Sequence, residues 1–110
     1  MESLKKKRDF DKVYSRGRYA ADSLFVVYAL ANDTEKNRLG LSISKKVGNA
    51  VVRNRVRRWL KESYRTQFAD IKQGYDFIFV ARAPSGKLLR EGAFVAVTRS
   101  LSGLFRRLKV

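Results

Sequence analysis

The side chains that could do chemistry in this chain are carboxylates and cations, because its 110 residues contain no histidine and no cysteine. These two absences remove the commonest general base, the thiol nucleophile, disulfides and the commonest zinc ligands. The acidic residues are scattered along the chain, and among those in a predicted helix only Asp9 and Asp11 lie close; residues two apart do not share a helix face. We therefore predict no catalytic residue and no metal site in the chain. A protein-only nuclease, built from carboxylates that meet only in the fold, is a minor alternative.

Cations dominate the composition, with 25 Lys and Arg against 10 Asp and Glu and a net charge of +15. A compact domain this basic predicts a nucleic-acid partner, because phosphates release condensed counterions when Lys and Arg replace them. An acidic lipid surface is the weaker alternative. No run approaches the roughly 18 apolar residues that span a bilayer, and the start lacks the apolar segment of a signal peptide. We expect a soluble, cytoplasmic protein with no membrane association.

The densest group of cations lies in a predicted helix over residues 50–68. At about 100° per residue, one side of this helix collects apolar and small residues, and another collects cations four residues apart. The apolar side comprises Val52, Val56, Trp59, Leu60 and Ser63, and the cationic stripe comprises Arg53, Arg57, Lys61 and Arg65. Like charges at this spacing repel each other. A face that repeats them is therefore more typical of polyanion binding than of a solvated surface.

Two further features fit a nucleic acid. Asn49 is a plausible N-cap, and Lys45 and Lys46 precede it, where free backbone N–H groups and the helix dipole favour a phosphate. Phe10 and Tyr14 are four apart on a predicted helix, and with Tyr28 on a strand they could stack on unpaired bases. Core packing is the alternative for these three aromatic side chains.

The periodicity of apolar residues predicts one domain, 1–110, with element order αββαβα. Helices are expected over residues 4–14, 50–68 and 91–108, strands over 23–30, 39–44 and 75–81, and loops over 32–37 and 84–86. We expect the first two strands to pair antiparallel. The fold class is α+β, a small sandwich with helices covering one face of a mixed sheet.

The string KKVGNAVVRNRVRRWL at residues 45–60, centred on Arg53-Asn54-Arg55, resembles the signature of the bacterial ribonuclease P protein subunit. The match includes the preceding strand at 40–44 and the Gly48-Asn49-Ala50 start of the helix. It extends to residues 9–14, 75–82 and 101–107, and so covers nearly the whole chain.

The resemblance implies an α-β sandwich with a left-handed βαβ crossover (ribosomal protein S5 domain 2-like), where general rules predict the opposite hand. It also implies an accessory subunit of a ribonucleoprotein endonuclease that joins ribonuclease P RNA and precursor tRNA. The holoenzyme removes the 5′ leader of the precursor, no protein partner is required, and the RNA, not the protein, holds the catalytic Mg²⁺.

Carried over position by position, the resemblance assigns two sets of RNA contacts. The set expected to bind the substrate leader is Phe10, Lys12, Tyr14, Tyr28, Arg57 and Lys61. The set expected to bind the catalytic RNA is Lys45, Lys46, Asn49, Arg53, Asn54, Arg55 and Arg58. Some relatives carry a C-terminal tyrosine that reaches the leader cleft, whereas this sequence has Leu108-Lys109-Val110 at its end. That side of the cleft is left unassigned.

Two other functions share the charge and the fold. A structural RNA-binding protein, such as a ribosomal component, would touch no substrate, and its aromatic residues 10, 14 and 28 would be buried. A transcription factor would place the basic helix in a DNA major groove. Against that function, the sequence shows no helix-turn-helix spacing and no dimerisation segment.

Overall fold

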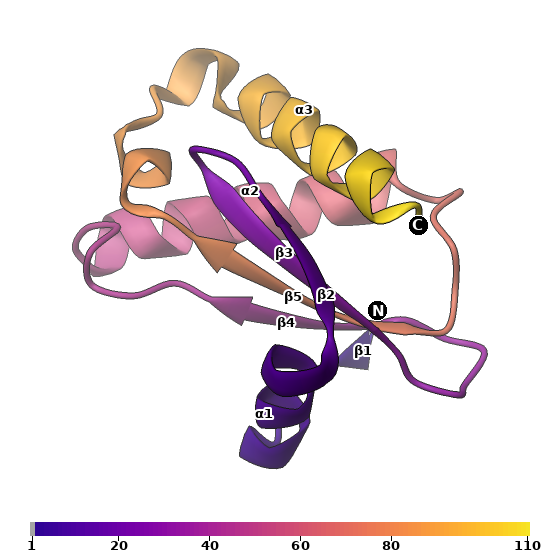
Figure 1. Cartoon of the computed structure of the whole chain (residues 1–110). Helices are drawn as coiled ribbons and strands as arrows, with labels where there is room; N and C mark the ends of the chain where they lie inside the picture. The colour runs from indigo at the N-terminus through magenta and orange to yellow at the C-terminus, as the bar shows by residue number, and fades with distance from the viewer. Residues whose placement is uncertain (1) are drawn as a thin grey trace.

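The computed structural model describes residues 2–110, which form a five-stranded sheet with helices on both faces (Figure 1). The strands and helices, in chain order, are β1 (Glu2–Ser3), α1 (Lys7–Arg16), β2 (Arg18–Ala21), β3 (Phe25–Ala31), β4 (Arg38–Ser42), α2 (Ala50–Gln67), β5 (Tyr75–Ala81), the 3₁₀ helix η1 (Ala83–Lys87) and α3 (Arg90–Leu108). The predicted order αββαβα is therefore confirmed, with two short strands, β1 and β2, added.

The sheet has the order β1-β4-β5-β3-β2, which corrects the predicted pairing of the strands at 23–30 and 39–44. β3 and β4 do not pair with each other, since β5 lies between them, antiparallel to β3 and parallel to β4. Phe77, Ile78 and Phe79 of β5 are fully buried although their side chains alternate between the two faces. A strand that is apolar on both faces belongs at the centre of a sheet.

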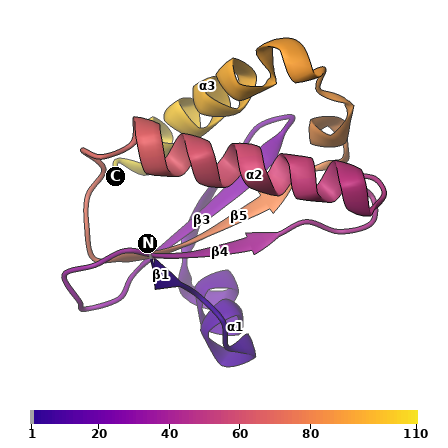
Figure 2. The same cartoon turned by 180° about the vertical axis from the view of Figure 1, so that it is seen from behind.

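The connection from β4 through α2 to β5 is a left-handed crossover, as the resemblance implied. Figure 2 shows both strands pointing the same way, with α2 running back above them on one side of the sheet. This hand is rare among parallel connections. The crossover places α2 on the same face of the sheet as α3, with its outer side in solvent.

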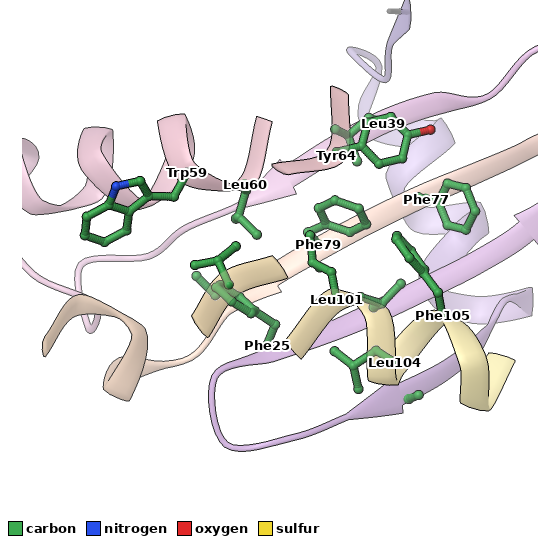
Figure 3. Close-up of a cluster of buried hydrophobic side chains, with 14 of the residues drawn as sticks. Phe25, Leu39, Trp59, Leu60, Tyr64, Phe77, Phe79, Leu101, Leu104 and Phe105 are labelled. Atoms are coloured by element: carbon green, nitrogen blue, oxygen red, sulfur yellow. The ribbon is translucent and has the colours of Figure 1, made fainter. Parts of the chain in front are cut away.

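The larger core lies between the sheet and the helices α2 and α3. Figure 3 shows the side chains that fill it: Phe25, Leu39, Trp59, Leu60, Tyr64, Phe77, Phe79, Leu101, Leu104 and Phe105. A smaller core lies on the other face, where Leu4 and Val13 pack against Ile78. The prediction that helices cover one face only is therefore wrong for α1. Alternation along β3 and β5 makes the second face apolar as well, and α1 covers part of it.

The ends of the predicted helices shift by a few residues. α1 begins at Lys7 and ends at Arg16, later than the predicted 4–14. Asn49 is confirmed as the N-cap of α2, because its side-chain oxygen accepts a hydrogen bond from the Val52 N–H at 3.0 Å. The backbone of α3 is non-helical at Glu91 and Gly92, and Gly92 has a positive φ of 81°.

A buried polar contact joins the C-terminal half of α2 to the sheet. The Asn37 amide donates to the Tyr64 hydroxyl at 3.2 Å and to the Lys72 carbonyl at 2.9 Å, and its oxygen accepts from the Tyr75 N–H at 2.8 Å. Burial raises the pKa of the Tyr64 hydroxyl above its usual value, and the hydrogen bond from Asn37 opposes this shift.

The raised pKa of Tyr64 makes folding sensitive to alkali. Above about pH 10 the unfolded chain ionises this tyrosine while the folded chain retains its proton. The folded state then binds more protons than the unfolded state, so the free energy of unfolding falls as the pH rises. We expect Tyr64→Phe to reduce this alkaline loss, measured by urea unfolding between pH 8 and pH 11. Tyr19→Phe, which removes an exposed hydroxyl, is the matched control and should retain the wild-type slope.

Candidate nucleic-acid interface

A row of side chains crosses the face of the sheet that carries α1. The strand register places Gly40, Ile78, Tyr28 and Tyr19 side by side on β4, β5, β3 and β2. Because residues directly opposite each other on paired strands point to the same face, Tyr19 and Tyr28 lie next to each other on this face. Helix α1 lies over part of the row and adds Phe10 and Tyr14 to it.

Four aromatic rings in this region form a connected series, which we call the aromatic cluster: Phe10, Tyr14, Tyr28 and Tyr19. Successive ring centroids lie 6.4, 4.9 and 5.5 Å apart, within the range of favourable aromatic contacts. Tyr14 meets Tyr28 edge-on at 89°. Phe10 and Tyr28 are half-buried, whereas Tyr14 is 39% exposed and Tyr19 is 66% exposed. The cluster therefore has an anchored side and an open side.

Two contacts set the position of α1 on the sheet. The Phe10 ring packs directly on Gly40, where an added Cβ would lie 2.6 Å from Cζ of the ring. Asp9, one residue earlier, lies 3.7 Å from the Arg38 guanidinium of β4. Arg38 in turn is bound by the buried carboxylate of Asp76. These contacts fix where the rings of Phe10 and Tyr14 stand.

Gly40→Ala should destabilise the protein, because the new methyl group occupies space that the Phe10 ring now fills. Overpacking of this kind costs about 1–3 kcal/mol of unfolding free energy. A double-mutant cycle with Phe10→Leu checks the cause, since the smaller side chain should relieve much of the penalty. If the two substitutions change the unfolding free energy, measured by chemical denaturation, in a strictly additive way, the packing of Phe10 on Gly40 is contradicted.

The outer side of α2 carries a shallow basic groove. Its lining residues all come from this helix: Asn54, Arg57, Arg58, Lys61, Glu62 and Arg65. The Arg57 guanidinium donates to the Asn54 side chain at 2.7 Å, and Arg65 pairs with Glu62 at 3.1 Å. Arg58 and Lys61 are exposed. The groove therefore presents cations at regular spacing to anything that lies along the helix.

The N-terminal end of α2 adds further donors. Lys45, Lys46 and Asn49 are exposed, and no acidic residue occurs in the first turn of the helix. Arg53 and Arg55 are half-buried. The Nε of Arg53 is buried without a hydrogen-bond partner among the described residues. A buried charged donor left unpaired is costly, so this end of the helix is suited to an anionic ligand.

The structure places the residues predicted to bind the leader in two separate regions. It brings Phe10, Tyr14 and Tyr28 together, with exposed Lys12 on the same helix as the first two. Arg57 and Lys61 belong to the helix layer on the other side of the sheet, so they do not line one pocket with the aromatic cluster. The predicted catalytic-RNA set, in contrast, lies together on α2 and in the turn before it.

Tyr19 is the member of the aromatic cluster that sequence reasoning missed. Its strand, β2, has four residues, Arg-Tyr-Ala-Ala, which show no clear alternation of apolar and polar side chains. The signal that could have identified it is the position of Gly17, which ends α1 one residue before β2 begins and so brings Tyr19 back beside the helix. A strand that short becomes visible only through its pairing with β3.

Two properties of residues 2–110 bear on other functions. No three side chains of the types His, Cys, Asp and Glu come close enough within residues 2–110 to hold a metal ion. Across the same residues, none of the helices combines the length and the apolar character that crossing a membrane requires.

The family model described as Ribonuclease P matches residues 1–109. The ribonuclease P protein component of Alkaliphilus metalliredigens (strain QYMF) is 44% identical over 107 residues, which cover 97% of this chain and 93% of the relative. The protein of the same name from Clostridioides difficile (strain 630) is 43% identical, covering 96% and 90%.

Two solved structures are similar to this chain over nearly its whole length. The Staphylococcus aureus RNase P protein superposes with a TM-score of 0.87 at 33% identity, covering 100% of this chain and 97% of that one. The RNase P protein of Thermotoga maritima gives a TM-score of 0.86 at 29% identity, with 97% of each chain covered. The extent of these matches, together with the fold, shows that the chain belongs to the ribonuclease P protein family.

Proposed function

We propose that this protein is the accessory subunit of a ribonuclease P ribonucleoprotein, which removes the 5′ leader of precursor tRNA. In this proposal the protein binds the catalytic RNA and the unpaired leader, and the catalytic Mg²⁺ ions are held by the RNA. The proposal rests on one observation. This member of the family carries both an exposed aromatic cluster and, separately, a basic helix. One surface suits unpaired bases and the other suits phosphates.

The aromatic cluster is the proposed site for the leader. Tyr14 presents an exposed ring that is held in place by Tyr28, so a base can stack on it without reordering the protein. Stacking tolerates any base, because every base has a π face. This suits a substrate class in which the leader differs from one precursor to the next. Exposed Lys12 of the same helix adds to the positive charge of this region.

Helix α2 and the turn before it are the proposed site for the catalytic RNA. Lys45, Lys46 and Asn49 lie where backbone N–H groups of the helix start can receive a phosphate. Arg53 gains a partner for its unpaired Nε from the same phosphates. The remaining members of this set, Asn54, Arg55 and Arg58, extend the contact along the helix.

Arg57 and Lys61 are proposed to meet the leader backbone after it leaves the aromatic cluster. Arg57 lies seven residues before Tyr64, two helical turns away on the same flank of α2. Tyr64 contacts Asn37, which immediately precedes β4, so this flank of the helix faces β4. Among the described residues, β1 pairs with Arg38 and Leu39 of β4. The rest of the β4 edge is left open for the RNA leader to cross.

The protein in this proposal positions its substrate, and the RNA performs the cleavage. Neutralising the phosphates of two RNAs that must approach each other lowers the repulsion between them. The complex should then need less Mg²⁺ than the RNA alone. A ribosomal RNA-binding role explains the charge equally well, but it gives no use for the exposed rings of Tyr14 and Tyr19.

Reconstitution tests the proposal. The purified chain is mixed with a ribonuclease P RNA at low Mg²⁺, and the release of the 5′ leader from precursor tRNA is followed. We expect cleavage to be stimulated, and we expect Tyr14→Ala to weaken the binding of precursors relative to leaderless tRNA. A failure to stimulate cleavage at any salt concentration would overturn the proposed function.

A further inference from the structure

Tyr19 has the most exposed ring of the aromatic cluster, with 66% of its surface open to solvent. It lies on β2, an edge strand, directly opposite Tyr28 of β3. Its neighbours in sequence, Arg18 and Ala20, point to the other face of the sheet, where Ala20 joins the larger core. The strand therefore directs the Tyr19 side chain to the face that carries α1, although this side chain is largely exposed to solvent.

The ring of Tyr19 is also held in orientation. Its centroid lies 5.5 Å from that of Tyr28 with an interplanar angle of 35°, whereas Tyr14 meets Tyr28 edge-on. Tyr14 and Tyr19 thus contact the same ring, Tyr14 from the helix and Tyr19 from the edge strand. Tyr28 supports one side of the Tyr19 ring, and the high exposure of Tyr19 shows that most of its remaining surface is free.

We propose that Tyr19 is an additional stacking platform, which takes a base of the unpaired leader beyond the bases held by Phe10, Tyr14 and Tyr28. The inference rests on the proposed function and deepens it, because it lengthens the leader-binding surface by one ring toward the β2 edge. Exposed Arg16, in the last turn of α1, supplies a cation for a phosphate next to this base. A preorganised ring binds at a small cost in conformational entropy.

The contact requires the ring, and the hydroxyl is dispensable. Stacking of a base on an aromatic side chain contributes roughly 1–3 kcal/mol and tolerates any base. Since every 1.4 kcal/mol is tenfold in affinity, loss of this ring should weaken binding of a sufficiently long leader by about 5- to 140-fold. Tyr19→Phe should bind like the wild type. Tyr19→Leu keeps apolar bulk on the strand, yet it should bind like Tyr19→Ala.

The experiment measures the affinity of the reconstituted holoenzyme for precursor tRNAs whose leaders increase in length from one to about ten nucleotides. The wild-type affinity should rise with leader length and then level off. Tyr19→Ala and Tyr19→Leu should match the wild type for the shortest leaders and level off earlier, at a weaker affinity. Thermal unfolding of each variant, followed by circular dichroism, confirms that the domain remains folded.

Two outcomes would overturn the role of Tyr19. An equal loss at every length, leaderless tRNA included, would place the ring against the catalytic RNA, and no loss at any length would mean that no base stacks on it. Tyr14→Ala, measured in the same series, separates this inference from the proposed function. A length-dependent loss of affinity for Tyr14→Ala alone refutes only the platform at Tyr19. If neither variant shows a length-dependent loss relative to the wild type, leader binding by the whole cluster is refuted.

Discussion

Replacement of Arg53, Arg55 and Arg58 together by glutamine should strongly weaken binding of the protein to the catalytic RNA and flatten the dependence of that affinity on salt. Each cation that neutralises a phosphate releases counterions, and each contributes roughly 0.7–0.9 to the slope of log affinity against log salt concentration. Removal of three such contacts should lower the slope by about two to three units. Affinity measured between 50 mM and 200 mM monovalent salt tests this prediction.

The matched control removes the same charge from a different place. Lys36, Lys72 and Lys109 are exposed and lie outside α2 and the turn before it. Their joint replacement by glutamine alters the net charge equally, so it reports the general effect of charge on binding. We expect the control to retain most of the wild-type slope. Equal slopes for the two triple variants would show that binding follows net charge, with no preferred phosphate contacts along α2.

Asp76→Ala should cause the largest loss of stability that a single polar substitution produces in this domain. Asp76 is 5% exposed and accepts two hydrogen bonds from Arg38, at 2.8 and 2.6 Å, and one from Asn32 at 2.9 Å. Breaking a buried pair on one side typically costs about 3–5 kcal/mol of unfolding free energy. Because the Arg38 side chain is 32% exposed and can recover some water, we expect about 2–3 kcal/mol.

The loss of Asp76 should also loosen α1. Arg38 links Asp76 to Asp9 of this helix, so a displaced guanidinium no longer fixes the helix end beside Phe10. Hydrogen exchange of the α1 amides should therefore accelerate more than the change in global stability explains. Asp70→Ala, at an exposed position, is the control and should leave both stability and exchange near wild type. Unchanged exchange in α1 would show that the helix is held by its apolar contacts alone.

Local signals account for the parts of the fold that the sequence predicted well. Helix α2 carries its own cap, its own apolar stripe and its own cationic stripe, all between Asn49 and Gln67, so nothing distant was needed to locate it. β5 was predicted from residue 75 to residue 81 and is found there, because Gly74 precedes it and residues 77–81 form a continuous apolar run.

The predictions that were wrong concern contacts between segments that are far apart in the sequence. The strands at 23–30 and 39–44 look like a hairpin locally, yet both pair with β5, whose residues lie more than thirty positions further along the chain. The placement of α1 under the opposite face follows from the same arrangement, since it depends on which face of β3 and β5 remains uncovered. Likewise, the aromatic residues 10, 14 and 28 were identified by type, but Tyr19 joins them only through strand pairing.

The central place of β5 has a consequence for synthesis on the ribosome. Before residue 81 has emerged, β3 and β4 lack their common partner, and of the sheet only the β2–β3 and β1–β4 pairs can form. Until then the growing chain displays Phe25 and Val27, which are later buried, next to its many cations. Such a nascent chain is exposed to aggregation. Completion of β5 therefore commits the polypeptide to its native topology in a late, cooperative event, which makes the period before β5 emerges the vulnerable interval in this protein's biogenesis.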